Sequence, residues 1–123
     1  MDESEFAERI AKIRARFISK LADKIQETDA ALPHLAGEGG GADAVAATYR
    51  RFHDMIGIGS TIGFEATGHA ARAIDAILVE PYRERRALSD DEVAKLVEGL
   101  KALRIVARTE MQSPQDSDRE LAS

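Results

Sequence analysis

The chain has 123 residues and a formal net charge of −5 at pH 7, with only 5% aromatic residues, so we expect one domain that does not bind nucleic acid. It contains no cysteine, which excludes disulfides, thiolate nucleophiles and thiolate metal sites and fits a reducing compartment. With no apolar run of membrane-spanning length and no signal-peptide pattern, the sequence predicts a cytoplasmic protein with no membrane association.

The first predicted helix covers Glu3–Ala31. A single apolar stripe recurs along it at three- and four-residue steps: Phe6, Ile10, Ile13, Phe17, Leu21 and Ile25. Asp2 and Glu5 have the spacing of a capping box at its start. Leu32-Pro33 is expected to end this helix, and the glycine-rich residues 37–41 predict a flexible loop.

The second predicted helix covers Ala42–Ile62, and the third, Glu65–Val79, follows almost at once. So short a connection forces an antiparallel hairpin. Gly63 is expected to end the second helix as a glycine C-cap, and Glu80-Pro81 to end the third. The inner faces are predicted to carry Val45, Tyr49, Phe52, Ile56 and Gly59 on the second helix, and Thr67, Ala70, Ala71, Ile74, Ile77 and Leu78 on the third.

A basic connector, Tyr82–Leu88, is expected to be solvated. Ser89 then caps the fourth helix, with Glu92 completing a capping box. The apolar stripe of this helix is Val93, Leu96, Leu100, Leu103 and Val106. Residues 112–123 are polar and predict a disordered tail. Residues 1–111 are therefore predicted to form an all-α antiparallel four-helix bundle with up-down-up-down topology.

His53 is the candidate functional residue, because Gly57 follows it one helical turn later. A glycine inside a helix costs about 0.5–1 kcal/mol relative to alanine. At this position it removes the side chain that would crowd the imidazole. Gly57 and Gly59 also fit close helix packing, which we favour for Gly59 because it lies on the inner face.

Asp75 is the expected partner of His53. Each residue lies about 100° from the centre of the apolar side of its own helix. His53 precedes Gly63 by ten residues and Asp75 follows it by twelve, so the hairpin places both at nearly the same height. We expect the carboxylate to accept a hydrogen bond from Nδ1 of His53, leaving Nε2 as a nucleophile.

The stretch around His53 resembles the histidine phosphotransfer (HPt) domain family. The family motif places glycine four residues after a histidine, then glycine and a bulky apolar residue at the tenth and eleventh positions. The corresponding residues here are His53, Gly57, Gly63 and Phe64. Ile74-Asp75 matches the apolar–acidic pair that the family carries on the next helix.

The resemblance implies a phosphocarrier in a multistep phosphorelay, with the phosphoryl group on Nε2 of His53, and not an independent enzyme. It implies partners that are receiver domains of hybrid histidine kinases and response regulators. The chain shows no phosphate loop and no metal cluster, so a partner must supply Mg²⁺, and we expect no cofactor and a monomer. Docking is expected around His53, at Arg50, Ile56, Ser60 and Arg72.

One position departs from the family pattern. The family usually has lysine three residues after the histidine, and this chain has Ile56. Arg50, one turn before His53, or Arg72 on the third helix are candidates to replace that cation. The alternative is that both arginines are solvated and that Asp75 pairs with Arg72.

Two other functions remain as alternatives. The first is an HPt-fold docking module that has lost phosphotransfer, as Ile56 would favour. The second is a helical metal-binding protein, which the different directions of His53 and His69 argue against. His69 is expected to be solvated and His34 to lie in a loop. Tyr49 is expected in the core, and Arg51 and the arginines of the connector on solvated surface.

Overall fold

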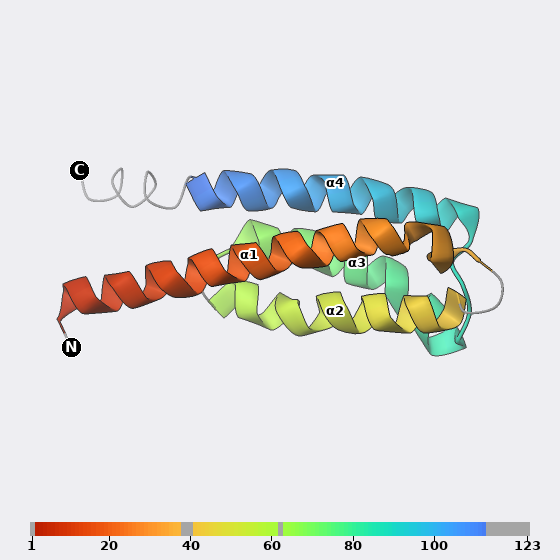
Figure 1. Ribbon diagram of the computed structural model, residues 1–123, viewed down its shortest axis with the longest axis horizontal. Helices are drawn as coiled ribbons and strands as arrows, with labels where there is room; N and C mark the ends of the chain where they lie inside the picture. The colour runs from red at the N-terminus through yellow and green to blue at the C-terminus, as the bar shows by residue number, and fades with distance from the viewer. Residues whose placement is uncertain (1, 38–40, 62, 113–123) are drawn as a thin grey trace.

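Four helices alternate in direction along one axis, as the sequence predicts (Figure 1). The computed structural model describes residues 2–37, 41–61 and 63–112, and leaves out the side chains of residues 57–61. The helices are α1 (Glu3–Leu35), α2 (Gly41–Thr61), α3 (Glu65–Glu84) and α4 (Asp90–Gln112). α1 and α3 each pack beside both α2 and α4. The all-α antiparallel bundle is thus confirmed. Of the predicted tail at 112–123, Gln112 is the last residue of α4, and residues 113–123 lie outside the described residues.

All four helices contribute predicted inner-face residues to the core. Its fully buried large side chains are Phe52, Phe64, Leu21, Leu35, Ile74, Leu78, Leu96, Leu100, Leu103 and Val45. Phe64 lies at the turn between α2 and α3 and stacks on Phe17 of α1, with ring centroids 5.4 Å apart. The guanidinium of Arg14 lies over the same ring, 4.7 Å from its centroid. The turn that joins α2 to α3 is therefore anchored against α1.

α1 extends beyond the bundle at its N-terminal end (Figure 1). With 33 residues it is about 50 Å long, whereas the 21 residues of α2 span about 30 Å. Phe6 and Ile13 are 60% and 45% exposed, but Phe17 is buried. The prediction that this apolar stripe packs into the core is therefore wrong for the part of α1 before Phe17. Periodicity shows that a helix is amphipathic and does not show what covers it.

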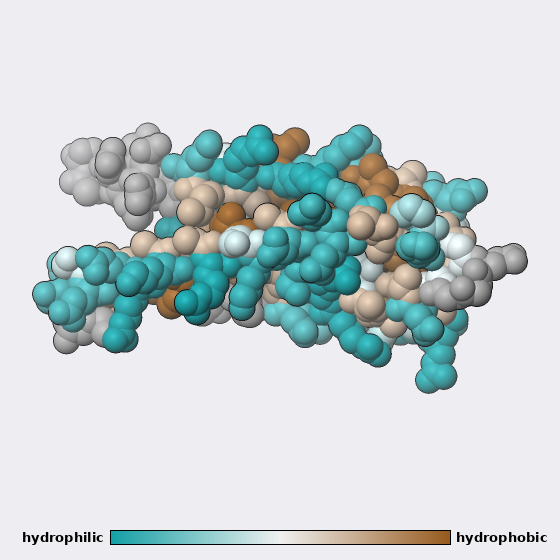
Figure 2. Space-filling model, viewed as in Figure 1, coloured by the Kyte–Doolittle hydropathy of each residue, from teal (hydrophilic) through white to brown (hydrophobic). Residues whose placement is uncertain are grey.

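Two open grooves border α1. The groove between α1 and α4 carries hydrophobic side chains between more hydrophilic flanks (Figure 2). It is lined by residues that include Ile18, Ala22, Ile25, Ala107 and Met111. The groove between α1 and α2 is lined by residues that include Ile13, Arg16, Lys20, Asp54 and Met55. His53 and Asp75 line neither groove.

Both predicted proline stops are wrong. α1 continues through Pro33 to Leu35, and α3 continues through Pro81 to Glu84. Each proline lies in or next to the last turn of its helix, so it removes only one helical hydrogen bond near a terminus. Packing outweighs that loss, because Leu35 and Pro81 are buried and the Leu35 carbonyl accepts the N–H of Leu88 at 2.8 Å. His34 therefore lies in a helix and not in a loop.

The two glycines next to α2 have different roles. Gly63 has φ +90°, a left-handed conformation that favours glycine, and it ends α2 as predicted. Gly41 was expected in a flexible loop, but it is the first residue of α2. A Cβ atom there would lie 2.7 Å from the Cβ of Ala87, so glycine permits this close approach. Residues 38–40 of the predicted loop lie outside the described residues.

α3 begins without a cap from its own sequence. Phe64 is the N-cap residue and its side chain makes no capping hydrogen bond. The carboxylate of Glu110 on α4 instead accepts the backbone N–H groups of Ala66 and Thr67, at 3.2 and 2.5 Å. A negative charge at a helix N-terminus satisfies free donors and complements the helix dipole. The end of α4 therefore fixes the start of α3.

The connector before α4 is tied by an ion pair, contrary to the solvated state expected for Arg86. Ser89 and Glu92 form the predicted capping box, with their reciprocal bonds at 2.9 and 3.2 Å. Arg86 donates two hydrogen bonds to the Glu92 carboxylate, at 2.7 and 3.1 Å, and one to Glu84. These bonds from Arg86, with those from Ser89, lower the pKa of Glu92 from 4.5 to about 2.

Glu92→Gln tests this ion pair. Glutamine still completes a capping box, so the variant removes mainly the charge-assisted bonds, and we expect it to lower the free energy of unfolding by about 1–2 kcal/mol at neutral pH. Because the folded-state pKa of Glu92 is depressed, its contribution is present above pH 4.5 and is lost as pH falls toward 2. Denaturant unfolding between about pH 7 and pH 3 should show the difference from wild type narrowing below pH 4.5.

Glu98→Gln is the matched control on the same helix. The Glu98 side chain is 75% exposed, and its one ion pair within the described part of the chain is with Lys101, three residues on. Its loss should change stability by less than about 0.5 kcal/mol. Equal effects of the two substitutions would contradict a special role for the Arg86–Glu92 pair.

Candidate functional site

His53 on α2 and Asp75 on α3 meet at the surface of the bundle. Nδ1 of His53 lies 3.2 Å from Oδ1 of Asp75, which is the contact that the helix spacing predicts. The imidazole is 57% exposed and the carboxylate 21% exposed. An ionised carboxylate only accepts hydrogen bonds, so this contact favours the tautomer with the proton on Nδ1. That tautomer leaves a lone pair on Nε2 of a solvent-accessible ring.

Asp75 does not pair with Arg72 among the described residues. Its ion-pair partner there is His53, and Arg72 is exposed. The half-buried carboxylate therefore acts on the imidazole and is not engaged by the arginine one turn earlier on α3. This result excludes the simple surface pair that the sequence left open.

Tyr49 is a site residue that sequence reasoning missed. It was expected only in the core, but its half-buried ring stacks on His53, with centroids 5.2 Å apart and planes 24° apart. Tyr82 of α3 stacks on Tyr49 in turn, at 4.2 Å and 21°. Tyr49 lies four residues before His53, and this spacing on one helix was the signal available. No such signal existed for Tyr82, because α3 was expected to end before it.

The structure does not bring Arg50 or Arg72 into an interaction with His53. Both arginines are exposed, and neither forms an ion pair with a described residue. Arg51 differs, since its Nε lies 3.1 Å from Glu27 and its Nη1 donates to Thr28 at 3.3 Å. The expectation that Arg51 is solvated is thus wrong, because Arg51 links α2 to α1.

Ile56 is partly buried and packs against the core. The position three residues after His53 therefore holds an apolar packing side chain. Gly57, Gly59 and Ser60 lie within α2, but their surroundings lie outside the described residues, so their predicted roles stay predictions.

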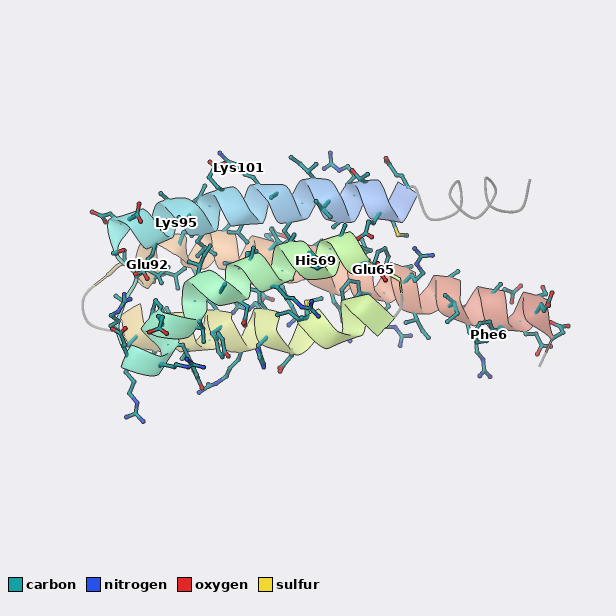
Figure 3. All side chains as sticks on the ribbon, turned by 180° about the vertical axis from the view of Figure 1, so that it is seen from behind. Phe6, Glu65, His69, Glu92, Lys95 and Lys101 are labelled. Atoms are coloured by element: carbon teal, nitrogen blue, oxygen red, sulfur yellow. The ribbon has the colours of Figure 1, made fainter. Side chains whose placement is uncertain are left out.

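The other two histidines lie apart from this site. His69 is exposed on the outward face of α3, as expected (Figure 3). His34 is exposed in the last turn of α1. Among the residues that the structure describes, no group of three or more histidine, aspartate or glutamate side chains is arranged to hold a metal ion. Within the same residues, no helix is both long and apolar enough to cross a membrane.

Comparison of the chain with protein-family models, with curated proteins and with solved structures finds no match. Any assignment of function therefore depends on the residues of this site. An exposed imidazole with one nitrogen held by a carboxylate can act as a base or as a nucleophile through its other nitrogen.

Replacement of Asp75 should change the tautomer of His53. In Asp75→Ala the hydrogen bond that holds the proton on Nδ1 is absent, so we expect the population of the Nδ1–H tautomer to fall. Nitrogen-15 NMR shifts of the imidazole measure this population directly. Asp54→Asn is the control, because Asp54 is an exposed carboxylate next to His53 in sequence with no ion pair in the described structure. An equal change in both variants would show that local negative charge, and not the hydrogen bond, sets the tautomer.

Proposed function

We propose that this protein is a histidine phosphotransfer protein of a multistep phosphorelay. In this proposal His53 accepts a phosphoryl group on Nε2 from the phospho-aspartate of one receiver domain and passes it to the aspartate of another. The observation that carries the proposal is the hydrogen bond between His53 Nδ1 and Asp75 Oδ1 on an exposed flank of a four-helix bundle. The match of His53, Gly57, Gly63 and Phe64 to the HPt motif supports it.

Phosphoryl transfer to His53 requires a lone pair on Nε2 and a group that stabilises the positive charge that forms on the imidazole. The lone pair of Nε2 forms the N–P bond while the bond between phosphorus and the aspartyl oxygen breaks, and the aspartate leaves as a carboxylate. The ring then carries a positive charge with its proton on Nδ1, and the hydrogen bond to Asp75 stabilises that charge. The second transfer runs this step in reverse onto another aspartate.

A phosphocarrier needs a nucleophile that two partners can reach in turn. The 57% exposure of the His53 side chain meets this need, since an enclosed imidazole would admit a small substrate and not a protein. Phosphoryl transfer depends on positioning and on neutralising charge, usually with Mg²⁺. The proposal assigns the metal and most of the catalysis to the partner, so the chain is a carrier and not an independent enzyme.

The proposal extends to partners and location. The partners would be receiver domains of hybrid histidine kinases and of response regulators, docking around His53 on a monomeric, cytoplasmic protein. Arg50, Ile56, Ser60 and Arg72 are the residues at which we expect that contact. No nucleic acid is involved.

A second candidate is a docking module of the same fold without phosphotransfer. The packing of Ile56 against the core favours it, because this position provides no cation for a phosphoryl group. The first experiment below separates the two candidates.

His53→Gln should abolish phosphorylation. A panel of receiver domains, phosphorylated with acetyl phosphate, is incubated with the protein, and acid-labile label on the protein is measured. We expect label on the wild type, none on His53→Gln, and full label on His69→Gln and His34→Gln, because those histidines lack a carboxylate partner in the described structure. Receivers that bind the wild type without labelling it would favour the docking module.

Asp75→Asn should slow transfer without preventing it. The amide does not stabilise a positively charged ring as a carboxylate does, so we expect a loss of about ten- to a hundredfold, or about 1.4–2.8 kcal/mol of transition-state stabilisation. Asp54→Asn should transfer at the wild-type rate. Rapid-quench measurement of a single turnover gives both rates, and a normal rate in Asp75→Asn would remove Asp75 from the mechanism.

Arg50→Ala and Arg72→Ala test for a local cation. A guanidinium near the phosphoryl group stabilises its negative charge, so loss of the contributing arginine should slow transfer about three- to tenfold. Arg83→Ala is the control, since Arg83 is exposed on α3 and pairs with Glu80. If both test variants transfer like the wild type, the partner alone neutralises the charge.

A further inference from the structure

Three aromatic rings from two helices form a continuous stack that ends at the imidazole. Tyr82 of α3 contacts Tyr49 of α2, and Tyr49 contacts His53, with centroid separations of 4.2 and 5.2 Å. The planes are 21° and 24° apart, so the rings are stacked. Both tyrosines are half-buried and pack against the core. The stack thus links the core to an exposed side chain.

We propose that Tyr49, held in place by Tyr82, is a positioning residue that orients the imidazole of His53 for phosphoryl transfer. This inference rests on the proposed function, because it assigns Tyr49 a role in that reaction. It concerns the orientation of the ring and not the docking of a partner.

A hydrogen bond alone does not orient the imidazole. The bond from Nδ1 to Asp75 constrains one edge of the ring, but χ2 of a histidine is a broad torsion, so small changes in χ1 and χ2 still tilt the ring. An aromatic ring against its face removes that motion, because tilting the imidazole would open the contact. Asp75 and Tyr49 together therefore define both the edge and the plane of the ring, and with them the position of Nε2.

Tyr82 gives Tyr49 its fixed position. A half-buried tyrosine on one helix has alternative rotamers, and a second ring from the neighbouring helix selects one of them. Tyr82 reaches Tyr49 because α3 continues through the buried Pro81 to Glu84. The extra turn of α3 thus contributes to the site, although Tyr82 lies about two turns after Asp75.

The stack also suits the phosphorylated form. When Nε2 carries the phosphoryl group and Nδ1 keeps its proton, the ring is positively charged. The face of an aromatic ring attracts a cation, and tyrosine and phenylalanine both provide such a face. The phenol hydroxyl is not needed for either effect, so the hypothesis requires the aromatic ring of Tyr49 and not its hydroxyl group.

The first test reads the orientation of the ring in the unphosphorylated protein. Proton NMR of the wild type should show the His53 ring protons shifted upfield by the ring current of Tyr49, whereas those of His69 and His34 should not be shifted. Tyr49→Phe should keep the upfield shift and Tyr49→Leu should lose it. In Tyr49→Leu the population of the Nδ1–H tautomer should also fall, because an untethered ring leaves Asp75 more often. Tyr82→Leu should give a partial loss of both signals.

The second test measures single-turnover transfer from a receiver domain phosphorylated with acetyl phosphate, over a range of receiver concentrations. Tyr49→Leu should lower the maximal rate about three- to tenfold and leave the half-saturating receiver concentration unchanged. Tyr49→Phe should transfer at the wild-type rate. Circular dichroism and thermal unfolding confirm that each variant is folded.

The outcomes separate this inference from the proposed function. If the wild type accepts no phosphoryl group, the proposed function fails and the role of Tyr49 in transfer fails with it, while the NMR result still reports the stack. If the wild type is phosphorylated but Tyr49→Leu keeps the wild-type maximal rate, Tyr49 is no positioning residue. A change in half-saturation alone would assign Tyr49 to docking and overturn the proposal.

Discussion

The antiparallel hairpin of α2 and α3 is the constraint on which the site depends. α2 ends at Thr61 and α3 begins at Glu65, with Gly63 in a left-handed conformation between them. A connection this short leaves the two helices no choice of direction and little choice of register. Residues that are equally far from the turn must therefore meet across the helix interface, as His53 and Asp75 do.

Several contacts hold the hairpin in its register. Phe64 anchors the turn against Phe17 of α1, and the Glu110 carboxylate of α4 binds the first N–H groups of α3. At the opposite end of the bundle, Tyr82 packs on Tyr49. The turn of the hairpin is thus attached to α1 and α4, and away from the turn α2 and α3 are attached to each other. Both attachments limit sliding of α3 along α2.

Sequence patterns predicted the number and direction of the helices and most of their described inner faces, because period-3.6 apolar stripes and short links report local structure directly. They failed where a distant contact outweighs a local preference. Pro33 and Pro81 suggest helix ends, yet packing of Leu35 and Pro81 carries both helices further. The capping of α3 by Glu110 could not be predicted from local sequence patterns, because 43 residues separate Glu110 from the N–H of Thr67 that it binds.

The sequence likewise predicted some contacts of the site and missed others. The pairing of His53 with Asp75 follows from counting residues on either side of Gly63, so it could be predicted from the sequence. Tyr49 lies on the same face as His53, but spacing alone does not distinguish a core tyrosine from one that stacks on the imidazole. Tyr82 required the true end of α3. The arginines illustrate a further limit, because long exposed side chains take positions that helix geometry does not determine.

The N-terminal extension of α1 is a separable part of the molecule. The N-terminal part of α1, which includes Phe6, extends past the other helices (Figure 3). A short helix is marginal in water without packing, so this extension can unfold locally while the bundle stays intact. In that state a protease can reach the residues of the extension, while the hairpin that carries His53 stays folded. Local unfolding of the start of α1 therefore leaves the arrangement of His53 and Asp75 unchanged.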